Sequence, residues 1–317
     1  MTQSAPTSRG GVGVAPHLAL VAVQLFFGTW PIAGKLVLRV LPSTGLVALR
    51  IAGATIAFVL LLRVTGHRPI ERNSDYLRLA LFSLLGVVLN QFLYVKGLAL
   101  STVINATLLG TTIPIFTLLV SFLLGNERPA LRHLLGMSLA AAGVIYLVDP
   151  LAANFSRTTM LGNILLIANT ICYAAYLAIS QDLIRRYGAL TVITWVFVFG
   201  SIMAVPFGGW YLARTPLLDV GAMIWLAVLY IILFPTVGAY YLNAWALGRV
   251  APSTVAIYIY LQPLFALALA PLLLGEQINS RTWLAALLIF AGVAIVTLRQ
   301  RSRVIEEVSE RPDALSR

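Results

Sequence analysis

Apolar stretches of about 20 residues follow one another along almost the whole chain, separated by short breaks at charges, proline and glycine. An α-helix of that length crosses the hydrocarbon core of a bilayer. Because 60% of the residues are apolar and only 10% are charged, the chain lacks the polar residues that an ordinary water-exposed surface needs. The sequence therefore predicts an all-α integral membrane protein with ten transmembrane helices, approximately at 17–38, 43–62, 76–98, 101–123, 131–148, 160–181, 190–211, 220–246, 251–274 and 282–298.

Lysine and arginine near the ends of these stretches indicate how the helices are oriented, because both accumulate on the cytoplasmic side of membrane proteins. With both termini in the cytoplasm, 15 of the 22 fall on the inner side and 6 on the outer side, and Lys96 lies near the outer end of the third stretch. This favours an even number of helices in the cell (inner) membrane. The net charge of +11 does not indicate a nucleic-acid partner, because the basic residues form no stripe with interleaved aromatics.

An internal repeat divides the chain into two halves. The segment from Pro114 to Phe116 recurs as Pro263 to Phe265, and Glu127 has its counterpart in Glu276, in both cases 149 residues later. Each half contains five predicted helices, and because five is odd the second half must enter the membrane upside down relative to the first. Inverted pairs of this kind are typical of secondary transporters.

We therefore expect two inverted five-helix repeats, at 17–148 and 160–298. Residues 1–16 are expected to be a cytoplasmic N-terminal segment, because the apolar stretch that follows them has no signal-peptide cleavage signature and is long enough to span. Residues 299–317 are expected to form a polar cytoplasmic tail.

Several motifs resemble the drug/metabolite transporter superfamily, and within it the EamA-like ten-helix transporters. They are Phe27 to Trp30 with Lys35, Leu49-Arg50, Gly97 to Leu100, the prolines 114 and 263 in the middle of their stretches, and the glutamates 127 and 276. The resemblance covers nearly the whole chain. It implies a carrier of amino acids, other metabolites or toxic compounds, with a central cavity lined by helices one, three, four, six, eight and nine.

Polar and aromatic residues inside the stretches are the candidates for binding a substrate, because such residues avoid lipid and face a cavity or another helix. For any single one, hydrogen bonding or packing between helices is an equally good explanation. A cavity of neutral amides, hydroxyls and rings suits a small zwitterion or an aromatic or apolar metabolite. The predicted substrate-binding residues are Gln24, Trp30, Asn90, Tyr94, Thr111, Thr112, Asn169, Tyr173, Tyr176, Tyr230, Tyr258 and Gln262.

Two prolines lie at corresponding depths in the two halves. Pro114 and Pro263 each remove one backbone hydrogen bond and are expected to kink or locally open their helices. Their symmetric placement favours a role in gating, and the alternative is that they only shape helix packing.

Three basic residues are predicted to place charge at the outer mouth of the cavity, namely Lys35, Arg50 and Lys96. Arg50 lies about 10 Å along the second helix and must find a partner there. The partner is expected to be an acid such as Glu276 or Asp149, and the alternative is a substrate carboxylate.

The types of residue that are missing from the stretches narrow the function. No Asp or Glu lies in the middle of a stretch, and the sequence has no HExxH or GxSxG motif, so an intramembrane enzyme is not expected. The single cysteine, Cys172, excludes an intramolecular disulfide. No cofactor and no metal are expected, and the partners are a small-molecule substrate and the lipid bilayer, with the chain as a monomer or a homodimer.

The function expected from these features is secondary transport by alternating access, most readily of amino acids or related neutral or aromatic compounds. The lack of a carboxylate deep in the membrane favours facilitated diffusion or exchange over proton coupling. The expected mode is an exporter or uncoupled facilitator. The alternatives are a proton-coupled exporter of drugs or toxic metabolites, and a passive channel.

Overall fold

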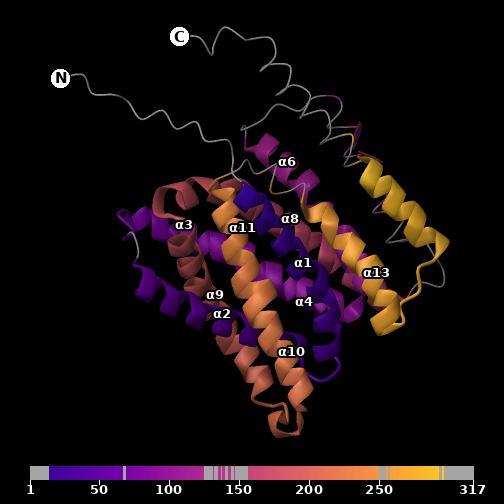
Figure 1. The fold of residues 1–317 in the computed structure, drawn as a ribbon, viewed down its shortest axis with the longest axis horizontal. Helices are drawn as coiled ribbons and strands as arrows, with labels where there is room; N and C mark the ends of the chain where they lie inside the picture. The colour runs from indigo at the N-terminus through magenta and orange to yellow at the C-terminus, as the bar shows by residue number, and fades with distance from the viewer. Residues whose placement is uncertain are drawn as a thin grey trace.

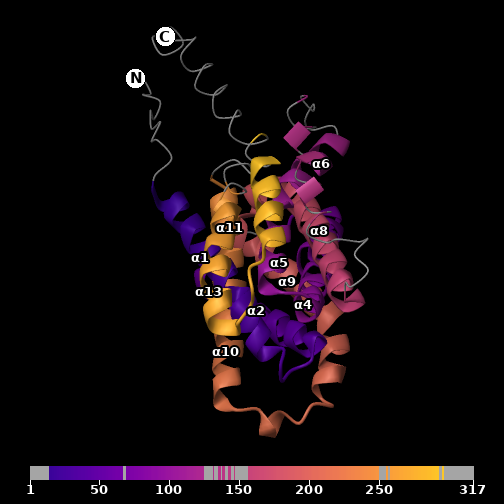
Figure 2. The ribbon, with the colours of Figure 1, turned by 90° about the vertical axis from the view of Figure 1, so that its right-hand side faces the viewer.

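The computed structural model describes residues 14–66, 69–124, 156–249 and 258–292, together with 131, 135–136, 138–139, 142–143, 146, 255 and 295. These residues form helices and turns, and no β-strand occurs among them (Figures 1 and 2). The α-helices are α1 (Val14–Val37), α2 (Ser43–Thr65), α3 (Asn73–Ser83), α4 (Asn90–Leu100), α5 (Val103–Gly110), α6 (Ile113–Leu123), α8 (Arg157–Tyr187), α9 (Ala189–Leu212), α10 (Ala222–Ile232), α11 (Ala239–Leu247), α13 (Gln262–Leu274) and a last helix, Ser280–Gly292.

Seven helical segments of this part of the chain are long and apolar enough to cross a membrane. They are Val14–Val37, Ser43–Thr65, Asn73–Leu100, Val103–Val120, Arg157–Tyr187, Ala189–Leu212 and Ala222–Leu247. α13 and the helix Ser280–Gly292 are shorter. Most of the predicted fifth helix, 131–148, lies outside the described residues, as do residues 1–13 of the expected N-terminal segment (1–16) and the tail at 299–317. The fold is therefore that of an all-helical membrane protein.

Two of the long segments contain a π-helical turn at matching positions. Residues Leu84–Leu89 form η1 between α3 and α4, and Leu233–Gly238 form η3 between α10 and α11. The offset between the two turns is 149 residues, the same offset that relates the sequence repeats. π-Turns inside α-helices are rare and occur frequently at functional sites.

The two prolines of the repeat both lie in the first turn of a helix. A turn at Thr111 and Thr112 separates α5 from α6, in which Pro114 is the second residue. In the other half, the 3₁₀ helix η4 (Tyr258–Leu261) precedes α13, in which Pro263 is the second residue. Proline is tolerated there because its missing N–H would have had no partner within the helix. The helix is thus interrupted directly before each proline, where the sequence predicted a kink or local opening.

Glycines allow the most closely packed helix pairs to approach. On α9, a Cβ added to Gly208 would lie 2.7 Å from the Cβ of Ala48 on α2, and closer still to the carbonyl oxygen of Thr44. On α4 and α8, an added Cβ at Gly97 or Gly162 would lie 2.9 Å from the carbonyl oxygen of the other glycine. Small residues at such crossings give membrane helices the close contact that replaces a hydrophobic driving force.

Replacing Gly208 with alanine is therefore expected to lower the free energy of unfolding by about 1–3 kcal/mol, the cost of overpacking a tight contact. The neighbouring Gly209 provides a matched control, because a Cβ added there meets nothing within 4 Å. Gly209→Ala should leave stability unchanged or raise it by about 0.5–1 kcal/mol through helix propensity. Thermal unfolding of the purified variants measures both, and equal midpoints would contradict the close packing of α2 on α9.

Candidate functional site

A cavity of about 90 Å³ lies in the middle of the helix bundle. A water molecule takes up about 30 Å³ in the liquid, so the cavity has room for on the order of three water-sized groups. Its walls come from α1, α2, α4, α5, α6, α8, α11 and the region of η4 and α13. The lining residues are Gln24, Phe27, Trp30, Arg50, Asn90, Gln91, Tyr94, Ala106, Gly110, Ile113, Asn169, Tyr173, Leu177, Tyr240, Asn243, Val255, Ile259 and Gln262.

Many of the lining residues occupy equivalent positions in the two halves. Six pairs are separated by 149 residues, the offset of the sequence repeat: Gln24 with Tyr173, Gln91 with Tyr240, Tyr94 with Asn243, Ala106 with Val255, Gly110 with Ile259, and Ile113 with Gln262. The two halves therefore contribute corresponding stretches of chain to the lining of the cavity. Arg50 is the one charged residue among the described lining residues, and the residue 149 positions later, Phe199, does not line the cavity.

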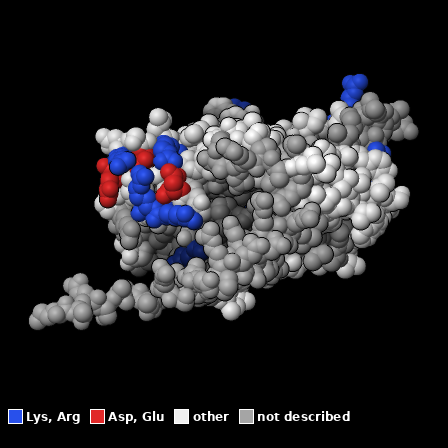
Figure 3. Space-filling model, turned by 90° about the horizontal axis from the view of Figure 1, so that it is seen from above, with Lys and Arg blue, Asp and Glu red and all other residues white. Residues whose placement is uncertain are grey.

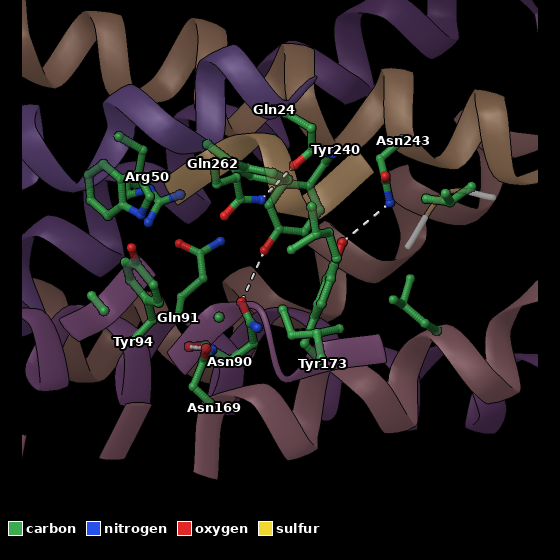
Figure 4. Close-up of a pocket in the computed structure, with 18 residues that line it drawn as sticks. Gln24, Arg50, Asn90, Gln91, Tyr94, Asn169, Tyr173, Tyr240, Asn243 and Gln262 are labelled. Carbon is green, nitrogen blue, oxygen red and sulfur yellow. Dashed lines mark hydrogen bonds between the residues drawn. The ribbon is translucent and has the colours of Figure 1, made fainter. Parts of the chain in front are cut away.

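Hydrogen bonds between side chains connect the walls of the cavity (Figure 4). Gln262 Nε2 donates to Gln24 Oε1 at 2.6 Å, which joins α13 to α1. The Tyr240 hydroxyl donates to Asn90 Oδ1 at 3.2 Å, and Asn243 Nδ2 donates to the Tyr173 hydroxyl at 3.3 Å. These contacts join the side chains of six lining residues in three pairs.

Arg50 lies in the cavity wall, and not at an outer mouth as the sequence analysis expected. Its residue is 3% exposed, its Nε donates to Thr236 Oγ1 in η3 at 3.1 Å, and its guanidinium carbon lies 3.9 Å from the centre of the Trp30 ring. Glu276 was expected as an acidic partner of Arg50, but its carboxylate accepts hydrogen bonds from the backbone of Val103 and Ile104 instead. Asp149, the other expected partner, lies outside the described residues. No carboxylate forms a salt bridge with Arg50 in the described part of the chain.

Gln91 lies beside Arg50 in the lining and is 1% exposed. Both polar atoms of its amide, Oε1 and Nε2, are buried without a hydrogen-bond partner. The Tyr240 hydroxyl is a hydrogen-bonding neighbour of this amide, but the hydrogen bonds that it completes run to Asn90 and, at 3.4 Å, to the carbonyl oxygen of Gly86. An unpaired amide of this kind is unusual, because nearly all buried polar groups in proteins are hydrogen-bonded.

Seven of the twelve predicted substrate-binding residues line the cavity: Gln24, Trp30, Asn90, Tyr94, Asn169, Tyr173 and Gln262. The other five do not. The hydroxyls of Thr111 and Thr112 donate to the carbonyl oxygens of Leu108 and Leu109, at the end of the preceding helix α5. Both threonines were predicted because they are polar residues within an apolar stretch. Their hydroxyls instead bond to backbone carbonyl oxygens nearby in the chain.

Three predicted tyrosines are also placed away from the cavity. Tyr176 packs closely against Gly86, where an added Cβ would lie 2.6 Å from its ring. The Tyr230 hydroxyl lies 2.5 Å from Thr29 Oγ1, and the Tyr258 hydroxyl lies 2.8 Å from His17 Nδ1. Each of these rings packs between helices, which was the alternative explanation for a tyrosine inside a span.

Lys35 and Glu276 both contact the junction of α4 and α5, at the end of the bundle where α1 ends. The Lys35 ammonium donates to the carbonyl oxygen of Ser101, and the Glu276 carboxylate accepts from the backbone N–H groups of Val103 at 2.7 Å and Ile104 at 3.1 Å. A carboxylate at the N-terminus of α5 satisfies donors that have no partner within the helix. We call these contacts the Lys35–Glu276 closure. Lys96, the third basic residue predicted for this end, is exposed.

Charged residues of both signs gather at the opposite end of the bundle (Figure 3). The Asp75 carboxylate at the start of α3 accepts from the Tyr187 hydroxyl at 2.7 Å and from Arg186 Nη1 at 3.1 Å, both at the end of α8. Arg78 and Asp182 form a second bridge between the same helices at 2.6 Å. We call this group the ionic cluster, and it ties the ends of α3 and α8 together.

The sequence analysis missed several lining residues and left others unselected. Gln91, Tyr240 and Asn243 are polar or aromatic but were not among the predicted residues, and Phe27, Ala106, Gly110, Ile113, Leu177, Val255 and Ile259 carried no polar signal. Applying the 149-residue offset to the predicted Tyr94 and Gln262 would have found Asn243 and Ile113. In the described part of the chain, no group of three or more His, Cys, Asp or Glu side chains is placed to hold a metal ion.

Comparison with known proteins relates the whole chain to membrane transporters. The sequence matches the EamA-like transporter family over residues 15–149 and 160–298. An uncharacterized transporter of Archaeoglobus fulgidus is 29% identical over 72% of this chain and 78% of its own length. An uncharacterized inner membrane transporter of Salmonella typhimurium, YicL, is 25% identical over 74% of this chain and 77% of its own.

A protein of known crystal structure has a similar fold. It is 19% identical, with a TM-score of 0.63 over 89% of this chain and 97% of its own. At this identity the likeness concerns the arrangement of the helices alone.

Proposed function

Because this chain belongs to the EamA-like transporter family and is a multi-pass membrane transporter, not an enzyme, we propose that it moves a small metabolite through the central cavity by alternating access. The observation that carries the proposal is the lining of that cavity, where corresponding positions of the two halves face a shared space. Two halves of opposite orientation can exchange conformations and expose one site to each side in turn.

The proposed architecture is ten helices in two inverted repeats, at 17–148 and 160–298, with both termini in the cytoplasm. The common offset of the π-turns, of the starts of α6 and α13 and of the lining pairs supports the repeat. The excess of lysine and arginine on one side supports the orientation. α1 begins at the end of the bundle that carries the ionic cluster, so this end would be cytoplasmic (Figures 2 and 3).

The proposed substrates are amino acids or related neutral or aromatic compounds, and the proposed mode is export or uncoupled facilitation. Amides, tyrosine hydroxyls and the rings of Phe27, Trp30, Tyr94, Tyr173 and Tyr240 line the cavity. Such groups bind small molecules that combine an apolar body with a few polar atoms. No Asp or Glu occurs among the described lining residues, so none of them brings a proton-carrying carboxylate to the proposed site.

The test is flux of labelled neutral and aromatic amino acids into proteoliposomes, with and without a pH gradient. We expect saturable flux that does not depend on the gradient. Accumulation driven by the gradient would refute uncoupled transport and favour proton-coupled export. Flux that never saturates would refute alternating access in favour of a channel.

The state described here would be closed on the outer side, because the Lys35–Glu276 closure lies at the end opposite the ionic cluster. Replacing Glu276 with glutamine weakens both the attraction to Lys35 and the hydrogen bonds at the N-terminus of α5. We expect the outer end to open more often. The reporter is a cysteine at Gly110, which lines the cavity and has room for a side chain, in a chain in which Cys172 is replaced by alanine.

A membrane-impermeant maleimide added from the outside should label this cysteine about five- to tenfold faster in Glu276→Gln, which corresponds to a loss of about 1–1.4 kcal/mol from the closed state. Asp219→Asn is the control, because Asp219 is an exposed acid at the same end of the bundle. Equal labelling rates in the parent and in Glu276→Gln would show that these contacts do not hold the outer end shut.

A further inference from the structure

The guanidinium of Arg50 is a buried charge whose partners in the protein do not neutralise it. It touches a threonine hydroxyl and the face of a tryptophan, and of its nitrogen atoms only Nε makes a hydrogen bond within the described residues. Removing a cation from water without an anion is unfavourable, and membrane proteins keep such residues where an ion or substrate must bind. In Figure 4 the two terminal nitrogens of Arg50 point into the cavity, toward Gln91 and Tyr94.

Gln91 supplies an independent sign of a missing ligand. Its amide is fully buried in the same wall, with both its donor and its acceptor unpaired. Leaving such a group unpaired costs stability, so its retention calls for a partner that binds from within the cavity. The π-turn η1 directly precedes this part of α4, and η3 presents Thr236 to Arg50, so both π-turns help to build this corner.

We propose that Arg50 binds the carboxylate of the transported molecule through its terminal nitrogens, that the Gln91 amide is a second contact to the same end of the molecule, and that the substrate is therefore a small monocarboxylate. This inference rests on the proposed transport function and names the substrate class for its cavity. A guanidinium presents two parallel N–H donors that match the two oxygens of a carboxylate. Because Arg50 is the one charged group among the described lining residues, one negative charge is matched and a second would remain buried without a partner.

The remainder of the cavity selects what the carboxylate is attached to. The Trp30 ring lies against the Arg50 guanidinium. Tyr94 lies near this corner, and Tyr240 and Tyr173 lie farther along the cavity (Figure 4). The amide oxygens of Asn169 and Asn243 provide acceptors in the same lining. An apolar or aromatic group, with or without an amino group, fits these surroundings, whereas a polyol or a polyphosphate does not.

The test uses acids paired with the primary amides that lack the negative charge. The pairs are L-alanine with L-alaninamide, L-phenylalanine with L-phenylalaninamide, and 3-phenylpropanoate with 3-phenylpropanamide. Dissociation constants are obtained from the shift of thermal unfolding with ligand concentration, on the full chain in nanodiscs. The wild-type protein should bind at least one acid about tenfold or more tightly than its amide, the effect of one charge-assisted, bidentate contact.

In Arg50→Gln the ratio of the affinity for the acid to that for the amide should fall to about one, because the positive charge and the two parallel N–H donors are both lost. Arg50→Lys keeps the positive charge but lacks the two parallel N–H donors, and it should retain part of the preference for the acid. This variant still tests the inference if Arg50→Gln folds poorly. Arg63→Gln is the matched control, since Arg63 is an exposed arginine near the end of the same helix, α2. Its ratio should equal that of the wild type.

An acid preference that survives in Arg50→Gln would overturn the inference while leaving transport intact. A wild-type chain that binds no acid of the panel more tightly than its amide would overturn it as well. If the preference depends on Arg50 but the same acids show no flux in proteoliposomes, the carboxylate site stands and the transport function fails. The binding and flux measurements therefore separate the two hypotheses.

Discussion

Replacing Gly110 with phenylalanine is expected to reduce transport about a hundredfold without unfolding the protein. Gly110 is the last residue of α5 and lines the cavity, and a Cβ added there meets no atom within 4 Å. A phenyl ring at this position would occupy space that the substrate needs. Rebuilding the wall around both ring and substrate would cost up to about 3 kcal/mol, which is about a hundredfold in the affinity of the site.

Flux into proteoliposomes measures this effect, and gel filtration shows whether the variant remains a single folded species. Gly110→Ala adds one methyl group and should retain most of the flux. Gly209→Phe is the matched control on the outside of the bundle, where a Cβ also meets nothing within 4 Å. If Gly110→Phe carried substrate at the rate of Gly209→Phe, the cavity would not be the route.

Replacing Gln91 with leucine is expected to change stability and binding in opposite directions. In the substrate-free protein the variant should be more stable by about 1–3 kcal/mol, because an unpaired amide is exchanged for an apolar group of similar size. The affinity for a monocarboxylate should fall about tenfold, since one contact to the substrate is lost. Thermal unfolding with and without the ligand measures both quantities in one experiment.

Gln262→Leu is the control, because the Gln262 amide lines the same cavity but, unlike that of Gln91, is hydrogen-bonded. The Gln262 amide donates to Gln24 at 2.6 Å, so its loss leaves Gln24 without this partner. That variant should be less stable than the wild type by about 1–3 kcal/mol. If Gln91→Leu and Gln262→Leu were destabilised alike, Gln91 would have a structural partner and the case for its role in binding would fail.

The empty site lowers the stability of the protein, because some of its polar groups have no partner among the described residues. Arg50 lacks a carboxylate in the described part of the chain and Gln91 lacks a hydrogen-bond partner, while the neighbouring Asn90 and Gln262 are bonded. Natural proteins accept such local destabilisation mainly at functional sites. The unpaired groups lie together in one corner, and the bonded groups hold the surrounding walls in place.

The amino-acid sequence was sufficient to predict the membrane class, the seven long spans described here and their approximate limits, because twenty apolar residues with few charges have few alternatives to a transmembrane helix. The family and its transport function were also predictable, from motifs such as Phe27 to Trp30 and the repeated prolines. Seven lining residues were identified from polarity and aromaticity alone.

Only the tertiary structure decided which side of each helix faces the cavity. Tyr173 lines the cavity and Tyr176, one turn along α8, packs against Gly86, although the two tyrosines are equivalent as sequence signals. Arg50 was assigned to an outer mouth because its depth was known and its surroundings were not. The physical reason is that lipid and protein interior are both apolar, so a membrane helix shows no contrast between a buried and an exposed face, and its rotation is set by contacts with helices far away in the chain.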